Sequence, residues 1–121
     1  MSTDVTISIF EVVGSSLCVA SGDGQKVYDR IAAVLKQDRR VSLSFRNVST
    51  LTSAFLNTAI GQLYGTFTED QIRALLTVED MEADDVALLK RVVDTAKRYF
   101  QDPERFNNMM REVLEDDGDD T

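Results

Sequence analysis

The segment from residue 41 to residue 65 reads VSLSFRNVSTLTSAFLNTAIGQLYG, and its pattern changes from that of a strand to that of a helix. Apolar residues alternate with serines over residues 41–45, which predicts a strand. A polar loop follows, and apolar residues then recur at helical spacing over residues 55–63. The polar pair Thr52 and Ser53 stands where this helix should begin. The segment therefore predicts a strand, a loop and a helix in that order.

The sequence before this segment predicts two strands and a helix. Val5–Phe10 alternates apolar and polar residues, and the apolar run Leu17–Ala20 reads as the returning strand of a hairpin. Ser21–Gly24 is a turn cluster that also suits a helix start or a phosphate site, although it lacks the spacing of known phosphate-binding loops. A helix with one apolar face follows over residues 25–37.

The sequence after the segment predicts one more strand between helices. Thr68–Gln71 fits a capping box that begins a short helix, and Ala74–Val78 reads as a strand. Asp84 or Asp85 should cap a helix that runs to Phe100. Strands that alternate with helices indicate an α/β domain.

The last part of the chain predicts a further helix and an acidic tail. Asp102 and Pro103 form a helix start, and Phe106, Met109 and Met110 belong to an apolar stripe on one face of the helix that follows. This stripe packs either on its own domain or on a partner, because methionine-rich faces adapt to partner surfaces. We expect one domain over residues 1–114, with a core at about 5–100 and this amphipathic helix at about 103–114. Residues 115–121 carry five acids and should be disordered.

Composition excludes several function classes. The 121 residues carry a net charge of −8, which argues against nucleic acid or an anionic membrane as partner. There is no histidine, so the commonest general base and the usual catalytic triads are absent. The single Cys18 can form no intramolecular disulfide and is expected to be a buried structural residue. No export signal or membrane-spanning run is evident, so the expected location is the cytoplasm.

Residues 41–65 also carry a family resemblance. The motifs Ser53-Ala54-Phe55 and Gly61-Gln62-Leu63, and the later helix over residues 88–100, resemble the STAS-like family of unknown function. That family is related to STAS domains, which occur in sulfate transporters and anti-sigma factor antagonists. The resemblance covers about residues 5–100. It implies a STAS-like fold, a mixed sheet of about four strands covered by helices, here with an extra C-terminal amphipathic helix.

The resemblance also implies a function without catalysis. In the antagonist branch a kinase partner phosphorylates a serine at this helix start, and by position that serine is Ser53, with Thr52 as its neighbour. A helix N-terminus favours the charge of a phosphate. The chain departs from the pattern at Thr52, Ala54 and Phe55, which replace an aspartate, a second serine and a glycine, and at Ser44, which replaces the strand's aspartate. The alternative is that Ser53 serves only as the helix N-cap.

The sequence is compatible with three function classes. The first is a regulatory module that binds a protein, such as a histidine-kinase-like ATPase or another regulator, without a cofactor or metal. Its candidate contact residues are Arg46, Asn47, Phe55, Phe106, Met109 and Met110. The second is an assembly protein that forms a homodimer through the C-terminal helix. The third is a small ligand-binding or nucleotide-binding domain, which lacks convergent charged residues in the sequence.

The remaining charged clusters have ordinary structural explanations. Arg39, Arg40 and Arg46 form the only local basic group, which either contacts solvent or pairs with a phosphate or carboxylates. Five acids between Glu79 and Asp85 lack the spacing of a calcium loop and suit a helix start.

Overall fold

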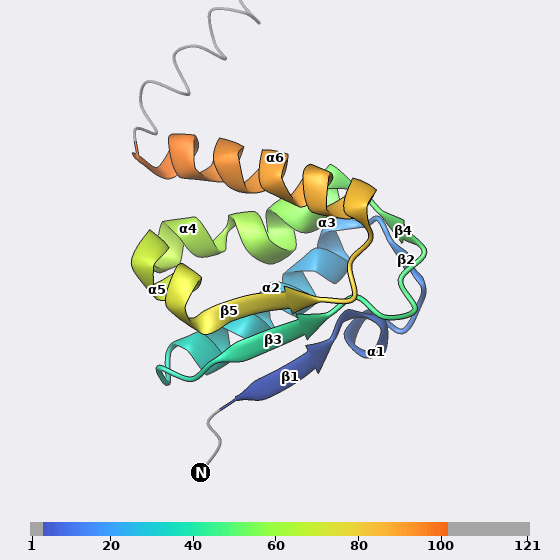
Figure 1. The fold of residues 1–121 in the computed structure, drawn as a ribbon, viewed down its shortest axis with the longest axis horizontal. Coiled ribbons are helices and arrows are strands. Elements are labelled where there is room, and N and C mark those ends of the chain that lie inside the picture. The colour runs from blue at the N-terminus through green and yellow to red at the C-terminus, as the bar shows by residue number, and fades with distance from the viewer. Residues whose placement is uncertain (1–3, 102–121) are drawn as a thin grey trace, which may run out of the picture.

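Three parallel strands form the main sheet of the structure, a computed structural model that describes residues 4–101 (Figure 1). They are β1 (Val5–Ser8), β3 (Val41–Ser44) and β5 (Leu76–Glu79), in the spatial order β1-β3-β5. The predicted strand at 41–45 is thus the central strand. Its residues pair in register with both neighbours, so that Leu43 lies between Ile7 and Val78.

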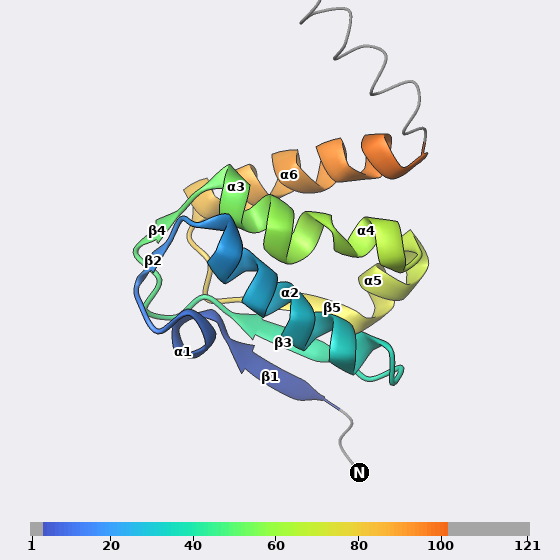
Figure 2. The ribbon, with the colours of Figure 1, turned by 180° about the vertical axis from the view of Figure 1, so that it is seen from behind.

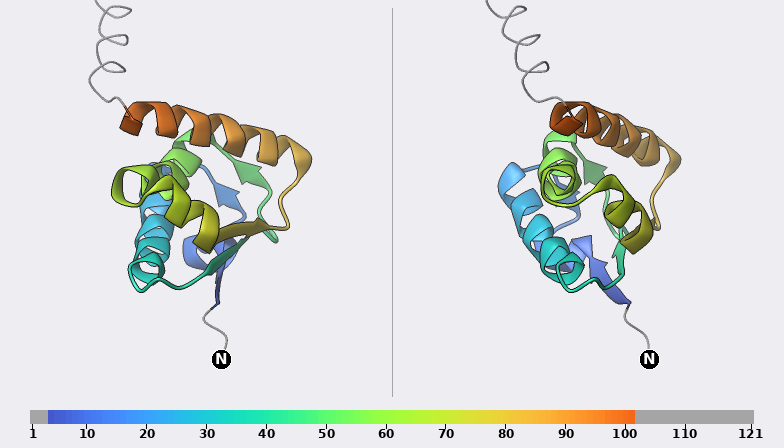
Figure 3. Two further views of the ribbon diagram at one scale, coloured as in Figure 1. Left: turned by 60° about the vertical axis from the view of Figure 1, so that its left-hand side comes forward. Right: turned by 90° about the vertical axis from the view of Figure 1, so that its left-hand side faces the viewer.

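The helices that connect these strands lie on one face of the sheet (Figures 2 and 3). α2 (Ser21–Leu35) returns the chain from β1 to β3. The second connection contains a helical stretch made of α3 (Ser53–Leu56), the π-helical turn η1 (Asn57–Gly61) and α4 (Leu63–Thr66). Right-handed crossovers that advance in the same direction across a sheet place their helices on the same side.

The two faces of the sheet differ in chemistry. Apolar side chains of β1 and β3 face the helices and are buried, among them Ile7, Val41 and Leu43. The opposite face carries rows of small polar residues, such as Thr6 beside Ser42 and Thr77. The main core therefore lies between one face of the sheet and the helices. Within residues 4–101, the buried residues are hydrophobic residues and glycines.

A second, two-stranded parallel sheet corrects the predicted hairpin. β2 (Leu17–Cys18) pairs with β4 (Thr50–Leu51), which lies in the stretch predicted as a polar loop, and β2 does not pair with β1. The predicted first strand ends at Ser8 because the Ser8 hydroxyl caps the short helix α1 (Ile9–Val13), accepting a hydrogen bond from the Glu11 amide. This helix turns the chain away from β1, so a direct return strand cannot form.

The elements after residue 67 lie close to where the sequence predicts them. The capping box of Thr68 and Gln71 is present and begins α5 (Glu69–Leu75). β5 begins at Leu76, two residues later than predicted, because α5 extends through Leu75. α6 (Ala83–Gln101) packs on η1 and α3. It begins at Ala83, so Asp84 and Asp85 lie in its first turn, where acids favour the helix dipole, and neither is its predicted cap.

The predicted α/β class with helix-covered strands is confirmed, and all strand pairings within residues 4–101 are parallel. The predicted C-terminal helix and acidic tail lie outside the described residues, as do Phe106, Met109 and Met110. In the described part of the chain, no helix is both long and apolar enough to cross a bilayer.

Candidate functional site

The predicted helix start at Thr52 and Ser53 is held by the small sheet of β2 and β4. The Thr52 amide donates to the Cys18 carbonyl at 3.3 Å, and the Thr52 hydroxyl donates to the Val19 carbonyl at 2.9 Å. The same hydroxyl accepts a hydrogen bond from the Phe55 amide at 3.2 Å. Thr52 is therefore the N-cap of α3, and its hydroxyl is used both as donor and as acceptor.

Ser53 differs from Thr52 in the state of its hydroxyl. Ser53 is the first residue of α3 and is exposed, and its hydroxyl has no hydrogen-bond partner among residues 4–101. The N-cap role predicted for Ser53 as the alternative to phosphorylation is wrong, because Thr52 fills that position. The structure thus separates the two predicted switch residues into one that holds the helix start and one that is accessible.

Two apolar side chains next to this helix start are exposed. Leu17 is 54% exposed and Val19 is 42% exposed, whereas Cys18 between them is fully buried. Val19 contributes the carbonyl that binds the Thr52 hydroxyl, so it lies next to the first residue of α3. We call Leu17, Val19 and Ser53 the ribbon–helix surface. It combines two exposed apolar side chains with an accessible hydroxyl.

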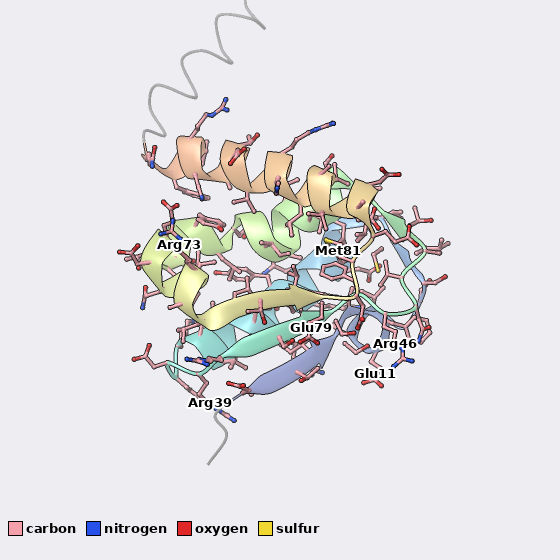
Figure 4. All side chains as sticks on the ribbon, in the orientation of Figure 1. Glu11, Arg39, Arg46, Arg73, Glu79 and Met81 are labelled. Carbon is pink, nitrogen blue, oxygen red and sulfur yellow. The ribbon has the colours of Figure 1, made fainter. Side chains whose placement is uncertain are left out.

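The other predicted contact residues do not join this surface. Arg46 and Asn47 are exposed in the turn that follows β3, and β4 separates them from the start of α3. Figure 4 labels Arg46 at the end of the sheet where β3 ends. Asn47 has a φ of 68°, a left-handed conformation that asparagine tolerates well, and Val48 closes this turn by donating to the Phe45 carbonyl.

Phe55 is a correction to the predicted contact residues. Its side chain is fully buried in the core, where it is the largest fully buried side chain of the described chain. α3 packs against both α2 and α6, so the buried aromatic ring contributes to stability and is inaccessible to a partner.

The turn cluster Ser21–Gly24 is the first turn of α2, and its glycine has a packing role. A Cβ atom on Gly24 would lie 2.7 Å from the Phe55 carbonyl oxygen and 3.0 Å from the Thr58 Cβ. The glycine thus permits the close approach of α2 to α3. Cys18 is buried as predicted, and burial, followed by the charge of Asp23, raises the pKa of its thiol. A raised pKa makes the reactive thiolate scarcer.

The acidic cluster between Glu79 and Asp85 lies at the end of β5 and the start of α6. No group of three or more acidic or cysteine side chains within 4–101 is arranged to hold a metal ion. Asp84 and Asp85 lie in the first turn of α6, where acids favour the helix dipole.

A cleft lies between β5, α5 and α6, and the sequence did not predict it. It has a volume of about 230 Å³ and lies on the helix-covered side of β5. Its wall is mostly apolar and includes Ile60, Ile72, Leu76, Val78, Leu89 and Val93. Tyr64, Glu69, Arg73 and Lys97 add polar groups to this wall.

The charged groups of this cleft are paired with one another. Lys97 Nζ lies 2.8 Å from Glu69 Oε1, and an Arg73 guanidinium nitrogen lies 2.9 Å from the same oxygen. The hydrogen bond from Lys97 is the main cause that lowers the pKa of Glu69, and the same bond raises the pKa of Lys97. Burial raises the pKa of the nearby Tyr64 phenol, whose ring centre lies 5.9 Å from Lys97 Nζ.

This cluster could not be read from the sequence because its members lie on three helices. The i, i+4 spacing of Glu69 and Arg73 is the one local signal, and it indicates only a surface ion pair. Lys97 reaches Glu69 through the packing of α6 against the earlier helices.

Comparison with known proteins identifies the fold family. No curated protein and no solved structure gave a significant match. The family model of the STAS-like domain of unknown function (DUF4325) matches residues 23–86, which is more than half of the chain. This range runs from the first turn of α2 to the first turn of α6 and contains Thr52 and Ser53. The predicted resemblance is therefore confirmed, and the chain belongs to the family of STAS-like domains of unknown function.

Proposed function

We propose that this chain is a regulatory protein-interaction module without catalytic activity, acting in the cytoplasm, and that it binds its partner through the ribbon–helix surface. One observation carries the proposal. The Ser53 hydroxyl is exposed and has no partner within residues 4–101, and its neighbour Thr52 is bonded to the backbone of Val19, in the segment that exposes the side chains of Leu17 and Val19. Partner surfaces commonly join such apolar contacts to a polar group that sets specificity.

Phosphorylation at Ser53 would act as the switch on this surface. A phosphate adds about −1.5 to −2 charges near neutral pH. At the first position of α3 this charge meets backbone amides of the helix start, which favour an anion. The same charge beside Leu17 and Val19 disfavours an apolar contact there, because the phosphate must keep its hydration. Phosphorylation of Thr52 would instead remove its hydroxyl proton and with it the hydrogen bond that the hydroxyl donates to the Val19 carbonyl.

The expected partner is a histidine-kinase-like ATPase or another protein regulator. This expectation comes from the antagonist branch of the related STAS domains, in which the phosphorylating kinase is also the binding partner. The chain departs from the STAS pattern at Thr52, Ala54 and Phe55, and the structure explains the residues at positions 52 and 55. Thr52 caps the helix, and Phe55 fills the core.

The test is capture of a partner from the native cell by the tagged 121-residue chain, with the intact mass of the recovered chain. The proposal expects an ATPase to bind the wild type and Ser53→Ala, and to bind Ser53→Asp to a clearly different extent. Recovered chain that carries the mass of one phosphate, located at Ser53, would support the switch. Equal capture by all three variants, with an unmodified mass, would refute it.

Two valines of similar exposure provide a matched control for the surface. Val19→Glu places a charge on the ribbon–helix surface, and Val78→Glu places the same charge on β5 in the cleft. We expect Val19→Glu to lose the captured partner and Val78→Glu to keep it. The reverse result would move the contact surface to the cleft.

Binding of a small ligand is a second candidate function, favoured by the cleft of about 230 Å³. The wall is apolar, and its two cations, Arg73 and Lys97, share the carboxylate of Glu69, so a small aliphatic carboxylate could add a second anion. Hexanoate is a direct probe, followed by amide chemical shifts of the full chain. Shifts confined to residues of the cleft, and absent in Val78→Glu, would support this candidate, whereas unchanged spectra would exclude hexanoate-like ligands.

A further inference from the structure

The outer edge of β1 is open to a further strand. Within residues 4–101, β1 pairs only with β3, so one of its edges has no neighbouring strand (Figure 2). The Val5 amide donates to the Arg40 carbonyl at 2.8 Å and thus faces β3. Because backbone groups alternate in direction along a strand, the amide and carbonyl of Thr6 face the open edge.

This edge lacks the features that usually protect an edge strand. β1 contains no proline and no charged residue, although Asp4 precedes it, whereas β5 at the other edge includes Glu79 as its last residue. Exposed edges without a charge, a proline or a covering segment are templates for pairing with another strand. The β1 edge is therefore better suited than the β5 edge to pair with a further strand.

A groove runs along the open edge of β1. It has a volume of about 430 Å³ and is bounded by β1, α1 and α2. Its apolar residues include Val5, Ile7, Val12 and Val34. Glu11 and Arg30 add one acidic and one basic side chain, and neither forms an ion pair within residues 4–101.

The two charges lie toward opposite ends of β1. Glu11 is on α1, which directly follows the carboxyl end of β1. Arg30 is in the second half of α2, which runs back toward the amino end because β1 and β3 are parallel. If a twofold axis perpendicular to the sheet related two copies at β1, Glu11 of each copy would lie toward Arg30 of the other copy. Such self-complementarity is what an isologous dimer requires.

We propose that the chain forms a homodimer in which the β1 strands of two copies pair antiparallel, with the twofold axis at Thr6. Each Thr6 amide donates to the Thr6 carbonyl of the other copy, and the two main sheets join into one continuous sheet. Val5 of one copy lies opposite Ile7 of the other on the helix-covered side. Glu11 of each copy pairs with Arg30 of the other. This interface is separate from the ribbon–helix surface, so the proposal does not depend on the proposed function.

The first test measures the mass of the full chain by sedimentation equilibrium over a range of concentrations. We expect the wild type to approach twice the chain mass. Thr6→Pro removes an amide that faces the open edge and should leave a folded monomer. Val78→Pro is the matched control, because the Val78 amide faces the open edge of β5. It should dimerise like the wild type.

The second test uses charge reversal and does not need the proline variants to fold. Glu11→Arg alone and Arg30→Glu alone each place like charges together at both contacts of the dimer. Each should weaken dimerisation by about tenfold or more. An equal mixture of the two single variants should restore it, because one copy then presents two basic side chains and the other presents two acidic ones.

Both contacts of this mixed dimer are attractive. The arginine introduced at position 11 of one copy faces the glutamate introduced at position 30 of the other, and the native Glu11 faces the native Arg30. Far-UV circular dichroism shows that each variant is folded. A wild type that stays monomeric at every concentration overturns the proposal. So does a dimer that survives Thr6→Pro, or a mixture no tighter than its components.

Discussion

The hydroxyl of Thr52 donates a hydrogen bond to the carbonyl oxygen of Val19 at 2.9 Å, across 33 positions of sequence. This bond joins the end of the β2–β4 sheet to the start of α3. It also explains why the accessible hydroxyl belongs to Ser53, since the neighbouring Thr52 is committed to the helix cap.

The first prediction compares the two hydroxyls. Thr52→Val keeps the shape of the side chain and removes both hydrogen bonds, so it should lower the free energy of unfolding by about 1–3 kcal/mol. Ser53→Ala should change it by about 0.5 kcal/mol or less, as exposed substitutions usually do. Urea denaturation measures both. A loss at Ser53 as large as that at Thr52 would contradict the assignment of the cap.

The second prediction compares two glycines in the first turn of α2. Gly24→Ala places a methyl group 2.7 Å from the Phe55 carbonyl oxygen, and backbone must move to make room. We expect a loss of about 1–3 kcal/mol in the free energy of unfolding. A Cβ atom on Gly22 would meet no tertiary neighbour within 4 Å, so Gly22→Ala should stabilise by up to about 1 kcal/mol. Thermal denaturation should move in opposite directions for the two variants.

The third prediction compares two serines on the polar face of β3. The Ser44 hydroxyl donates to Asp80 and accepts from the Arg46 amide, both at 3.3 Å. Ser44→Ala should therefore cost about 0.5–1.5 kcal/mol. The Ser42 hydroxyl is buried and has no partner among the described residues. Ser42→Ala removes that unsatisfied group, and we expect a free energy of unfolding equal to or above the wild-type value. A larger loss at Ser42 than at Ser44 would show that Ser42 is bonded.

The fourth prediction concerns how the contribution of the Glu69–Lys97 pair to stability changes at low and at high pH. The pKa of Glu69 is lowered from its ordinary 4.5, so the pair stabilises the fold above that value and loses this contribution as the pH falls through the lowered pKa. The pKa of Lys97 is raised from 10.5, so its contribution is complete below that value and is lost as the pH rises through the raised pKa. The difference in unfolding free energy between the wild type and Glu69→Gln should shrink at both limits.

Lys97→Met provides the control for this pair. If the Glu69–Lys97 hydrogen bond causes the pH dependence, Glu69→Gln should have less effect in the Lys97→Met background than in the wild type. Additive losses in the double variant, measured by urea denaturation at neutral pH, would show that the two side chains act independently.

The secondary structure and the family follow from short-range patterns in this sequence. The alternation in β3, the apolar face of α2 and the capping box of Thr68 and Gln71 each involve residues a few positions apart. Such patterns report hydrogen bonds and burial that form within one element, so they remain visible without the rest of the chain. The central stretch also carried the family resemblance, which the match over residues 23–86 confirms.

The features that govern the candidate sites arise from contacts between distant segments. β2 pairs with β4 and not with β1, and this pairing selects Thr52 as the cap and leaves Ser53 accessible. Phe55 is buried where α3 packs against α2 and α6, and Lys97 meets Glu69 because α6 packs on the earlier helices. Local sequence does not specify such contacts, since the free energy that selects among them comes from the joint burial of whole elements.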